Sequence, residues 1–355
     1  MTDFIRYQSP ASLRITSNME RSLEEVFSNK IFTEGKYTRK FEQRFKEEFD
    51  LSSDCVAVSS CTSGLILAMR AFGIRFPIIS DYTFSATAHA AHFACQKFDV
   101  GDIDMQTFNM LPILPMKCDA IAVTHTFGNP CDCMALQELA EERNAHLIFD
   151  SAHAIGASLF NRSIAEFGDA SVFSFSPTKH ITAGEGGMII TKHKHIAERV
   201  RILKNYGTEK NYECSMPGLN ARMSEFHAII GLESLRSFRK RQAHRIRLVK
   251  EYELLLRDKV KFQQVIRNGE SAWKDFTLII EPKKIGRLRT MLLSKHNIET
   301  KSYFRPISSL SCYRGSFKAQ SNAKKLSMRV IQPPLHDGLS IDDIEYISRQ
   351  ILKYI

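Results

Sequence analysis

Residues 173–191 read FSFSPTKHITAGEGGMIIT, and the interpretation of the whole chain starts from this stretch. Apolar residues lead into a hydroxyl-rich turn that carries Lys179, and a glycine-rich bend then leads into a β-branched run. This pattern suits a lysine held at the bottom of a cleft on a bent backbone. A desolvated lysine loses its proton easily and becomes a nucleophile. The alternative is a solvated lysine in a glycine turn, because lysines are mostly exposed.

Composition sets the broad class of protein. The chain has 355 residues, of which 43% are hydrophobic, enough for one large or two modest domains with a sizeable core. No apolar stretch reaches the roughly 18 residues that a membrane span needs. The N-terminal residues 1–6 lack the basic segment and apolar core of a signal peptide. We therefore expect a cytoplasmic protein without a membrane partner, whose eight cysteines are reduced thiols.

The chain is basic, with a net charge of +10 at pH 7. This charge fits a solvated basic surface, an anionic substrate or nucleic acid. The densest basic cluster, residues 236–247, follows a helical pattern and has no aromatic platform beyond Phe238. Because no nucleic-acid-binding signature is present, we expect no nucleic-acid partner and favour a phosphorylated small molecule.

The first two thirds of the chain alternate short β-branched runs with helical patterns. Near-continuous apolar strands separated by helices predict an α/β fold with a mostly parallel sheet covered by helices on both faces. The predicted strands are 55–59, 76–80, 120–125, 145–150, 170–175 and 187–191, and the predicted helices are 64–72, 85–95 and 134–144.

The last third follows a different pattern. A helical stretch over residues 224–259 leads into a smaller α+β unit, with a strand at 276–280 and a closing helix at 341–355. We place the domain boundary inside the long helix. The prediction is a large domain of residues 1–240, whose N-terminal segment could pack on the smaller unit, and a small C-terminal domain of residues 241–355.

The strand at residues 56–58 runs into Ser59-Ser60-Cys61-Thr62-Ser63-Gly64 and then into an apolar helix. The free backbone N–H groups of a helix N-terminus, with hydroxyls beside them, form an anion site. The segment therefore reads as a phosphate cradle or as an ordinary capped helix start.

Asp150 ends an apolar strand and precedes Ser151-Ala152-His153-Ala154-Ile155-Gly156. Ligands of open α/β sheets bind at the carboxyl ends of strands. An acid there is desolvated and needs a cationic partner, such as a protonated heterocyclic nitrogen. The alternative is an aspartate that caps a helix.

The cradle, the acid and the lysine together fit one cofactor. Pyridoxal phosphate needs a lysine for its aldehyde, an acid that keeps its pyridine nitrogen protonated, and a cradle for its phosphate. The sequence therefore predicts a pyridoxal-phosphate enzyme.

Seven ordered segments resemble the DegT/StrS family of pyridoxal-phosphate-dependent sugar aminotransferases. These enzymes have the aspartate-aminotransferase fold (fold type I), a seven-stranded-type sheet sandwiched by helices with a smaller C-terminal α+β domain. The matching segments are 33–42, 59–65, 81–88, 125–130, 150–157, 174–187 and 218–223.

The resemblance implies a role for each matching residue. Lys179 would carry the covalent cofactor linkage and shuttle the proton, and Asp150 would pair with the pyridine nitrogen. His153 would lie near the ring's 3-hydroxyl side, and Phe84 would stack on the ring. The implied phosphate ligands are Thr62, Ser63 and Ser174, with Asn220 supplied by the neighbouring subunit of a homodimer; Glu185 and Tyr82 would lie on the substrate side.

Some residues depart from the family pattern. Cys61 stands where the family prefers glycine, and residues 226–227 replace a common Leu-Gln pair. Segments before Phe76 and between residues 104 and 120 look short, which weakens any substrate assignment by analogy. A metal site formed by Cys118, His125, Cys131 and Cys133 is not expected, because Cys-x-Cys is not the usual spacing of structural zinc.

The resemblance implies an aminotransferase that moves an amino group from an amino acid, with glutamate preferred, to a keto group of a nucleotide-linked sugar. One alternative is an aminotransferase of a non-nucleotide keto-sugar or keto-cyclitol. Others are a sugar dehydratase of the same family, in which histidine replaces the lysine, and a non-catalytic binding protein on the same scaffold.

Overall fold

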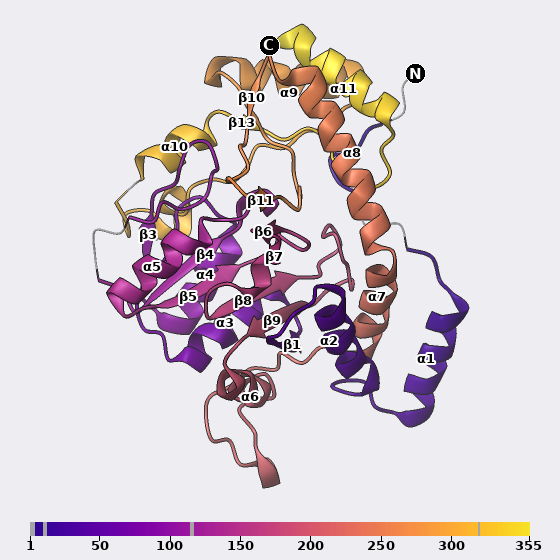
Figure 1. Cartoon of the computed structure of the whole chain (residues 1–355), viewed down its shortest axis with the longest axis vertical. Helices are drawn as coiled ribbons and strands as arrows, with labels where there is room; N and C mark the ends of the chain where they lie inside the picture. The colour runs from indigo at the N-terminus through magenta and orange to yellow at the C-terminus, as the bar shows by residue number, and fades with distance from the viewer. Residues whose placement is uncertain (1–3, 10–12, 114–116, 319) are drawn as a thin grey trace.

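The computed structural model describes residues 4–9, 13–113, 117–318 and 320–355. Residues 1–3, part of the stretch read above for a targeting signal, lie outside this range. A seven-stranded sheet forms the centre of the molecule (Figure 1). Its order is β1 (Asp54–Val58), β9 (Gly187–Thr191), β8 (Ala170–Ser174), β5 (His146–Asp150), β4 (Ala120–Thr124), β2 (Pro77–Ser80) and β3 (Asp99–Gly101).

Strand β9 runs antiparallel to both of its neighbours, whereas the pairs from β8 to β3 are parallel. The sheet is therefore mostly parallel, as the sequence predicts. Sequence reading missed β3, because a strand of three residues is too short to carry a periodic pattern.

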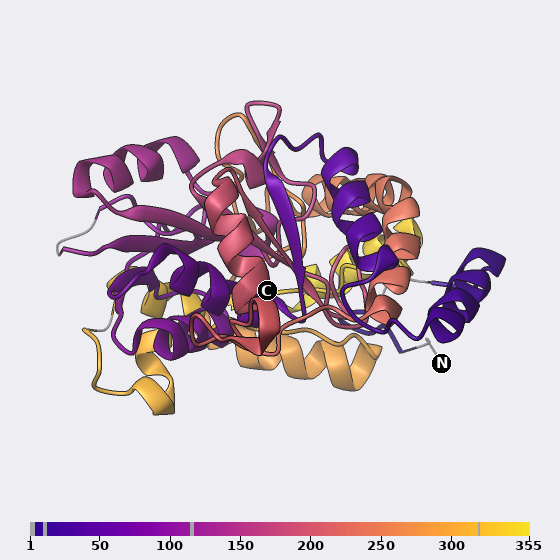
Figure 2. The same ribbon diagram turned by 90° about the horizontal axis from the view of Figure 1, so that it is seen from below.

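Helices cover both faces of the sheet because the side chains of each strand alternate between two apolar clusters. In β4, Ile121 and Val123 join one cluster, and Ala120 and Ala122 join the other. Figure 2 shows helices on both sides of the sheet. The first cluster lies under α2 (Lys36–Glu48), α5 (Cys133–Arg143) and α7 (Glu225–Arg236); the second lies under α3 (Cys61–Phe72), α4 (Ser85–Cys95) and α6 (Lys194–Leu203).

The prediction of a single long helix over residues 224–259 is wrong in one respect. It consists of α7 and α8 (Phe238–Leu256), which meet at Ser237, where φ is −97° and ψ is 0°. The Arg241 guanidinium donates to the Ser234 carbonyl at 2.7 Å. This bond satisfies a carbonyl that the break leaves without its helical partner, so the junction costs little.

The chain beyond α7 forms an apolar core of its own, with the rings of Tyr252 and Phe276 stacked 5.0 Å apart. This part lies above the sheet in Figure 1. Its elements include α8, α9 (Pro282–His296), α10 (Ser321–Ser327), α11 (Ile341–Tyr354) and a three-stranded sheet of β10 (Lys261–Phe262), β12 (Leu278–Ile279) and β13 (Val330–Ile331). The division at residue 240 remains a prediction.

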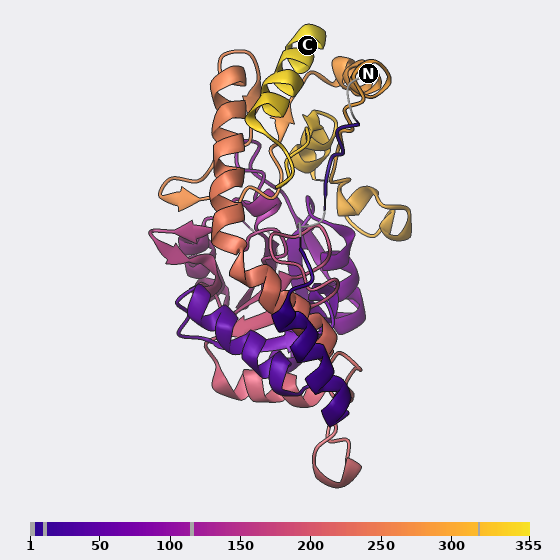
Figure 3. The same ribbon diagram turned by 90° about the vertical axis from the view of Figure 1, so that its right-hand side faces the viewer.

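Two further segments complete the fold. A small sheet joins β6 (Ser158–Leu159), β7 (Arg162–Ser163) and β11 (Gly269–Glu270), and α1 (Ser17–Asn29) lies at the margin of the molecule. Near the N-terminus, the Ile5 amide donates to the Asn297 carbonyl at 2.8 Å. The N-terminal segment therefore runs alongside the C-terminal part of the chain (Figure 3).

Within the described residues, no helix is long and apolar enough to cross a membrane.

Candidate active site

Three segments meet at the carboxyl edge of the sheet and enclose a cavity of 180 Å³. β5 ends at Asp150, β1 leads into α3, and β8 leads into the turn that carries Lys179. Because β1, β5 and β8 all point the same way, their carboxyl ends lie along one edge. The cavity is lined by Ser60, Cys61, Thr62, Phe84, Ala86, Thr124, Asp150, Ala152, His153, Ser174, Ser176, Lys179, Glu185 and Phe304.

Backbone bonds fix the turn of Lys179. Its amide donates to the Ser176 carbonyl at 3.0 Å, and the Phe175 amide donates to the Gly186 carbonyl at 2.9 Å. Gly187 then passes so close to α3 that a Cβ atom there would lie 2.7 Å from the Cys61 amide nitrogen. A side chain at this position would therefore push the lysine turn away from the helix N-terminus, which explains the glycine.

The cavity changes the chemistry of Lys179. Burial, reinforced by the nearby Lys274, lowers the pKa of its amine to about 8, and Asp150 opposes the shift. The residue as a whole is only partly buried because its side chain lines the cavity. An amine with a pKa near 8 is available as a neutral nucleophile under mild conditions.

Asp150 lies at the base of the cavity, with 4% of its surface exposed. Its Oδ2 atom accepts a hydrogen bond from the Thr87 hydroxyl at 2.6 Å, and its Oδ1 atom accepts one from the Ala152 amide at 3.1 Å. Burial raises the pKa of this carboxyl, and these hydrogen bonds partly offset that effect. A buried carboxylate of this kind gains most from a cationic ligand group brought next to it.

The start of α3 forms the anion site. Ser60 caps the helix, and its side chain forms a reciprocal capping box with Ser63. The Ser63 hydroxyl accepts a hydrogen bond from the Ser60 amide at 3.1 Å, so it turns back toward the cap and away from the cavity. Thr62 does line the cavity, together with Ser174 on the adjoining strand.

Aromatic side chains form the remaining walls. Phe84 keeps 59% of its surface exposed although it borders the cavity. The His153 ring lies nearly parallel to the Phe304 ring at 5.9 Å. The Nδ1 atom of His153 is buried without a hydrogen-bond partner among the described residues. A cavity lined by an exposed ring and by a histidine whose ring nitrogen lacks a partner suits a planar polar ligand.

Seven of the residues that the sequence singled out meet around this cavity: Thr62, Phe84, Asp150, His153, Ser174, Lys179 and Glu185. Asn220 does not reach it and is exposed on the loop after α6. Tyr82 is fully buried, and its hydroxyl donates to the Tyr303 carbonyl at 2.9 Å. Tyr82 lines neither of the cavities beside Lys179, and its place on the substrate side stays a prediction.

A second cavity, of 300 Å³, adjoins the first and shares Lys179 with it. Sequence reading missed several residues of this cavity. The signal that could have found Lys274 is the charged pair Lys274-Asp275, which stands directly before the apolar run 276–280. The lining consists of Gln8, Phe84, His153, Ser176, Thr178, Lys179, Lys274, Tyr303 and Phe304.

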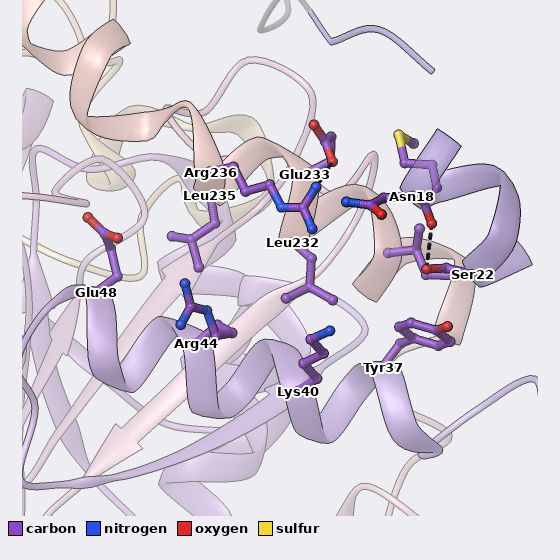
Figure 4. A pocket seen from close by; sticks show the side chains of 12 residues that line it. Asn18, Ser22, Tyr37, Lys40, Arg44, Glu48, Leu232, Glu233, Leu235 and Arg236 are labelled. Carbon is purple, nitrogen blue, oxygen red and sulfur yellow. Dashed lines mark hydrogen bonds and ion pairs between the residues drawn. The ribbon is translucent and has the colours of Figure 1, made fainter. Parts of the chain in front are cut away.

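A separate pocket of 280 Å³ lies between α1, α2 and α7 (Figure 4). Charged side chains line it, including Lys40, Arg44, Glu48 and Arg236. Arg236 pairs with Glu233 at 3.0 Å in a half-exposed contact. Neither a buried acid nor a desolvated lysine lines this pocket, so we assign the chemistry to the cavities beside Lys179.

The fold and the Lys179 site define a pyridoxal-phosphate enzyme of fold type I. The chain belongs to the DegT/DnrJ/EryC1/StrS aminotransferase family, whose model matches residues 14–352. It is an aminotransferase that depends on pyridoxal phosphate.

Named relatives and a solved structure agree with this family. The chain is 32% identical to dTDP-4-amino-4,6-dideoxy-D-glucose transaminase of Shigella dysenteriae, over 93% of each chain. It is 29% identical to GDP-perosamine synthase of Escherichia coli O157:H7, over 91% of this chain and 92% of that enzyme. The crystal structure of DesI, determined in the presence of its TDP-sugar product, aligns with a TM-score of 0.90 at 28% identity, covering 99% of this chain and 93% of DesI.

The residues around the cavity fit pyridoxal phosphate. Asp150 supplies the buried acid, the N-terminus of α3 supplies N–H donors for a phosphate, and Lys179 supplies the amine. The unpartnered Nδ1 atom of His153 offers a hydrogen bond at the cavity wall. The donor set therefore matches the cofactor's three polar ends.

The depressed pKa of Lys179 predicts how the apo-protein captures its cofactor. Only the neutral amine attacks an aldehyde, so the rate of covalent attachment rises with pH through the lysine pKa. We expect a midpoint at about 8, well below the 10.5 of an ordinary lysine. The measurement is the rate of the absorbance change on mixing apo-protein with pyridoxal phosphate at stepped pH. Lys274→Met should move the midpoint upward, because it removes a repelling charge; a rate that climbs only near 10.5 contradicts the buried setting.

Proposed function

We propose that this enzyme transfers an amino group from an amino acid, with glutamate the preferred donor, to a keto group of a nucleotide-linked sugar. The observation that carries the proposal is the pairing of a desolvated lysine with a buried acid across one cavity, Lys179 with Asp150. The lysine provides a base and a nucleophile, and the acid provides a fixed negative charge. Transamination needs both.

Each residue has a defined task. When bound, pyridoxal phosphate supplies an aldehyde that bonds to amines and a ring that accepts an electron pair. Lys179 would hold the cofactor through its amine, would give way to the amine of the donor, and would then move the proton from the donor's α-carbon. Asp150, oriented by Thr87 and the Ala152 amide, keeps the ring nitrogen protonated. Thr62 and Ser174 bind the phosphate, Phe84 covers the ring, and Glu185 lies toward the substrate.

The choice of a nucleotide-linked sugar rests on three supports. The relatives named above are a dTDP-amino-sugar transaminase and a GDP-perosamine synthase, and DesI was crystallised with a TDP-sugar. The net charge of +10 favours a substrate with a diphosphate. The second cavity gives room beside Lys179 for a second reactant. A non-nucleotide keto-sugar remains the alternative substrate, and the cytoplasmic location remains a prediction.

Two other functions have less support. A dehydratase of this family would carry histidine where this chain has Lys179. A non-catalytic scaffold would have no need to keep a lysine at a pKa of about 8 beside a buried acid. Both features cost folding free energy, because each desolvates an ionisable group.

The proposal is tested by supplying L-glutamate and a panel of dTDP-, GDP- and UDP-linked keto-sugars to the purified holo-enzyme. We expect an aminated nucleotide-sugar, detected by mass, from the wild-type enzyme and none from Lys179→Ala, which should keep the fold. Product formed at the wild-type rate by Lys179→Ala contradicts the lysine assignment. Amination of free keto-sugars alone, with nucleotide-linked ones inert, selects the alternative substrate.

We further propose a two-fold homodimer in which Asn220 completes the phosphate site of the partner subunit. Asn220 is exposed and lies outside both cavities of its own chain. It lies at the base of the loop that projects from the body below α6 (Figure 1), where it forms a β-bridge with Asn205; farther along the same loop, Tyr212 has 95% of its surface exposed. Tyrosine is enriched at protein interfaces, and this supports the proposed contact.

The dimer proposal predicts that cofactor binding and dimerisation strengthen each other, because a ligand held by both chains stabilises their association. Sedimentation of the holo-protein and of protein stripped of pyridoxal phosphate measures this linkage. Asn220→Ala should weaken both cofactor affinity and the dimer. An active holo-protein that is monomeric at micromolar concentration contradicts the shared site.

A further inference from the structure

Lys274 is a second buried lysine in the active site. It follows β11 and has 3% of its surface exposed, yet it lines the 300 Å³ cavity together with Lys179. Its amide donates to the Phe127 carbonyl, and the Ala272 amide donates to the Gly128 carbonyl, each at 2.9 Å. The segment is thereby tied to the turn that follows β4, so the position of Lys274 is fixed by backbone bonds.

The charge of Lys274 is poorly compensated. Among the described residues, the one hydrogen-bond acceptor recorded for its Nζ atom is the Asp275 Oδ1 atom, at 3.4 Å. That distance exceeds the usual length of a charged hydrogen bond, which is about 2.8 Å. An ammonium group carries three N–H donors, so the single long bond to Asp275 leaves most of its bonding capacity open to a ligand in the cavity that Lys274 lines.

Asp275 cannot come closer because other donors hold it. Its Oδ1 atom accepts from the Tyr7 hydroxyl at 2.5 Å and from the Gln8 side-chain amide at 3.2 Å. Its Oδ2 atom accepts from the Tyr303 hydroxyl at 3.3 Å. The N-terminal segment and residue 303 therefore share the carboxylate with Lys274, and this division of one negative charge leaves the lysine in need of another anion.

Both reactants carry an anionic group. The two differ in how far that group lies from the carbon that reacts. The carboxylate of an amino donor is attached directly to the carbon that reacts at Lys179. The diphosphate of a nucleotide-linked sugar is separated from the reacting keto carbon by part of the sugar ring. An anion site deep in the same cavity as Lys179 therefore matches the donor's carboxylate.

We propose that Lys274 is the specificity residue that binds a carboxylate of the amino donor beside Lys179. The assignment rests on the proposed function, since it presumes an amino-acid donor. Asp275, held by Tyr7, Gln8 and Tyr303, positions the lysine without neutralising it. Because Tyr7 and Gln8 belong to the N-terminal segment, that segment contributes to donor recognition.

The direct test uses glutarate, a dicarboxylate that has no amino group and therefore binds without reacting. Calorimetry on the holo-enzyme should show binding of glutarate and none of its uncharged diamide. Lys274→Met should weaken glutarate binding by about 10- to 100-fold, the cost of losing a charged hydrogen bond. It should leave the affinity for dTDP unchanged. If Lys274→Met does not fold, Lys274→Gln keeps a polar side chain of similar length for the same titration.

Lys204→Met is the matched control. Lys204 has 2% of its surface exposed and pairs with Glu34 at 2.6 Å, but it lines neither cavity. Its removal also deletes a buried charge, and glutarate affinity should remain that of the wild type.

Each of the remaining outcomes rejects either the assignment of Lys274 or the proposed function. Unchanged glutarate affinity in the Lys274 variant, or a loss of dTDP affinity alone, overturns the assignment of Lys274. A wild-type enzyme that aminates keto-sugars from glutamate but does not bind glutarate also overturns it. A wild-type enzyme that aminates no keto-sugar rejects the proposed function itself, so the two failures are distinguishable.

Discussion

The site depends on burying an acid and a lysine in one cavity at the carboxyl edge of the sheet. Asp150 and Lys179 both line this cavity, and burial raises the pKa of the acid and lowers that of the amine. Each shift brings a group closer to its neutral form, at a cost in folding free energy. The burial of apolar strands against helices on both faces of the sheet offsets this cost. A cationic ring nitrogen would be a partner for Asp150, and an aldehyde would be a partner for Lys179.

The second constraint is the closeness of segments that lie far apart in the sequence. Gly187 lets the lysine turn touch the start of α3, and the Lys274 segment is bonded to the turn after β4. Residues 303 and 304 then bring aromatic rings from the C-terminal part of the chain over the cavity. The cofactor side of the site therefore comes from the central sheet, whereas the proposed substrate side draws on both ends of the chain.

Sequence reasoning predicted the central sheet, and it singled out seven residues that line one cavity, because the signals for both are local. The strand that ends at Asp150, the glycine bend after Lys179 and the capped start of α3 are each readable within about ten residues. The substrate side was less accessible, because Lys274, Tyr303 and Phe304 acquire meaning only through contacts across the chain. The burial of Tyr82 was not accessible from the sequence for the same reason, because its ring packs against residues from distant parts of the chain, such as Phe304. The break at Ser237 was missed because arginine side-chain bonds, which no periodicity reveals, satisfy the helix end.

The most direct test of the account is the rate of the first half-reaction in Asp150→Asn, measured by stopped-flow absorbance with the donor that the wild-type enzyme accepts. Asparagine has the same shape but no charge, so it cannot keep the ring nitrogen protonated. The account predicts that the variant still binds pyridoxal phosphate, through Lys179 and the α3 cradle. It also predicts that proton transfer slows by about 100-fold or more, the magnitude expected when one preorganised electrostatic group is lost. A variant that binds the cofactor and reacts at the wild-type rate would contradict the central role given to the buried acid.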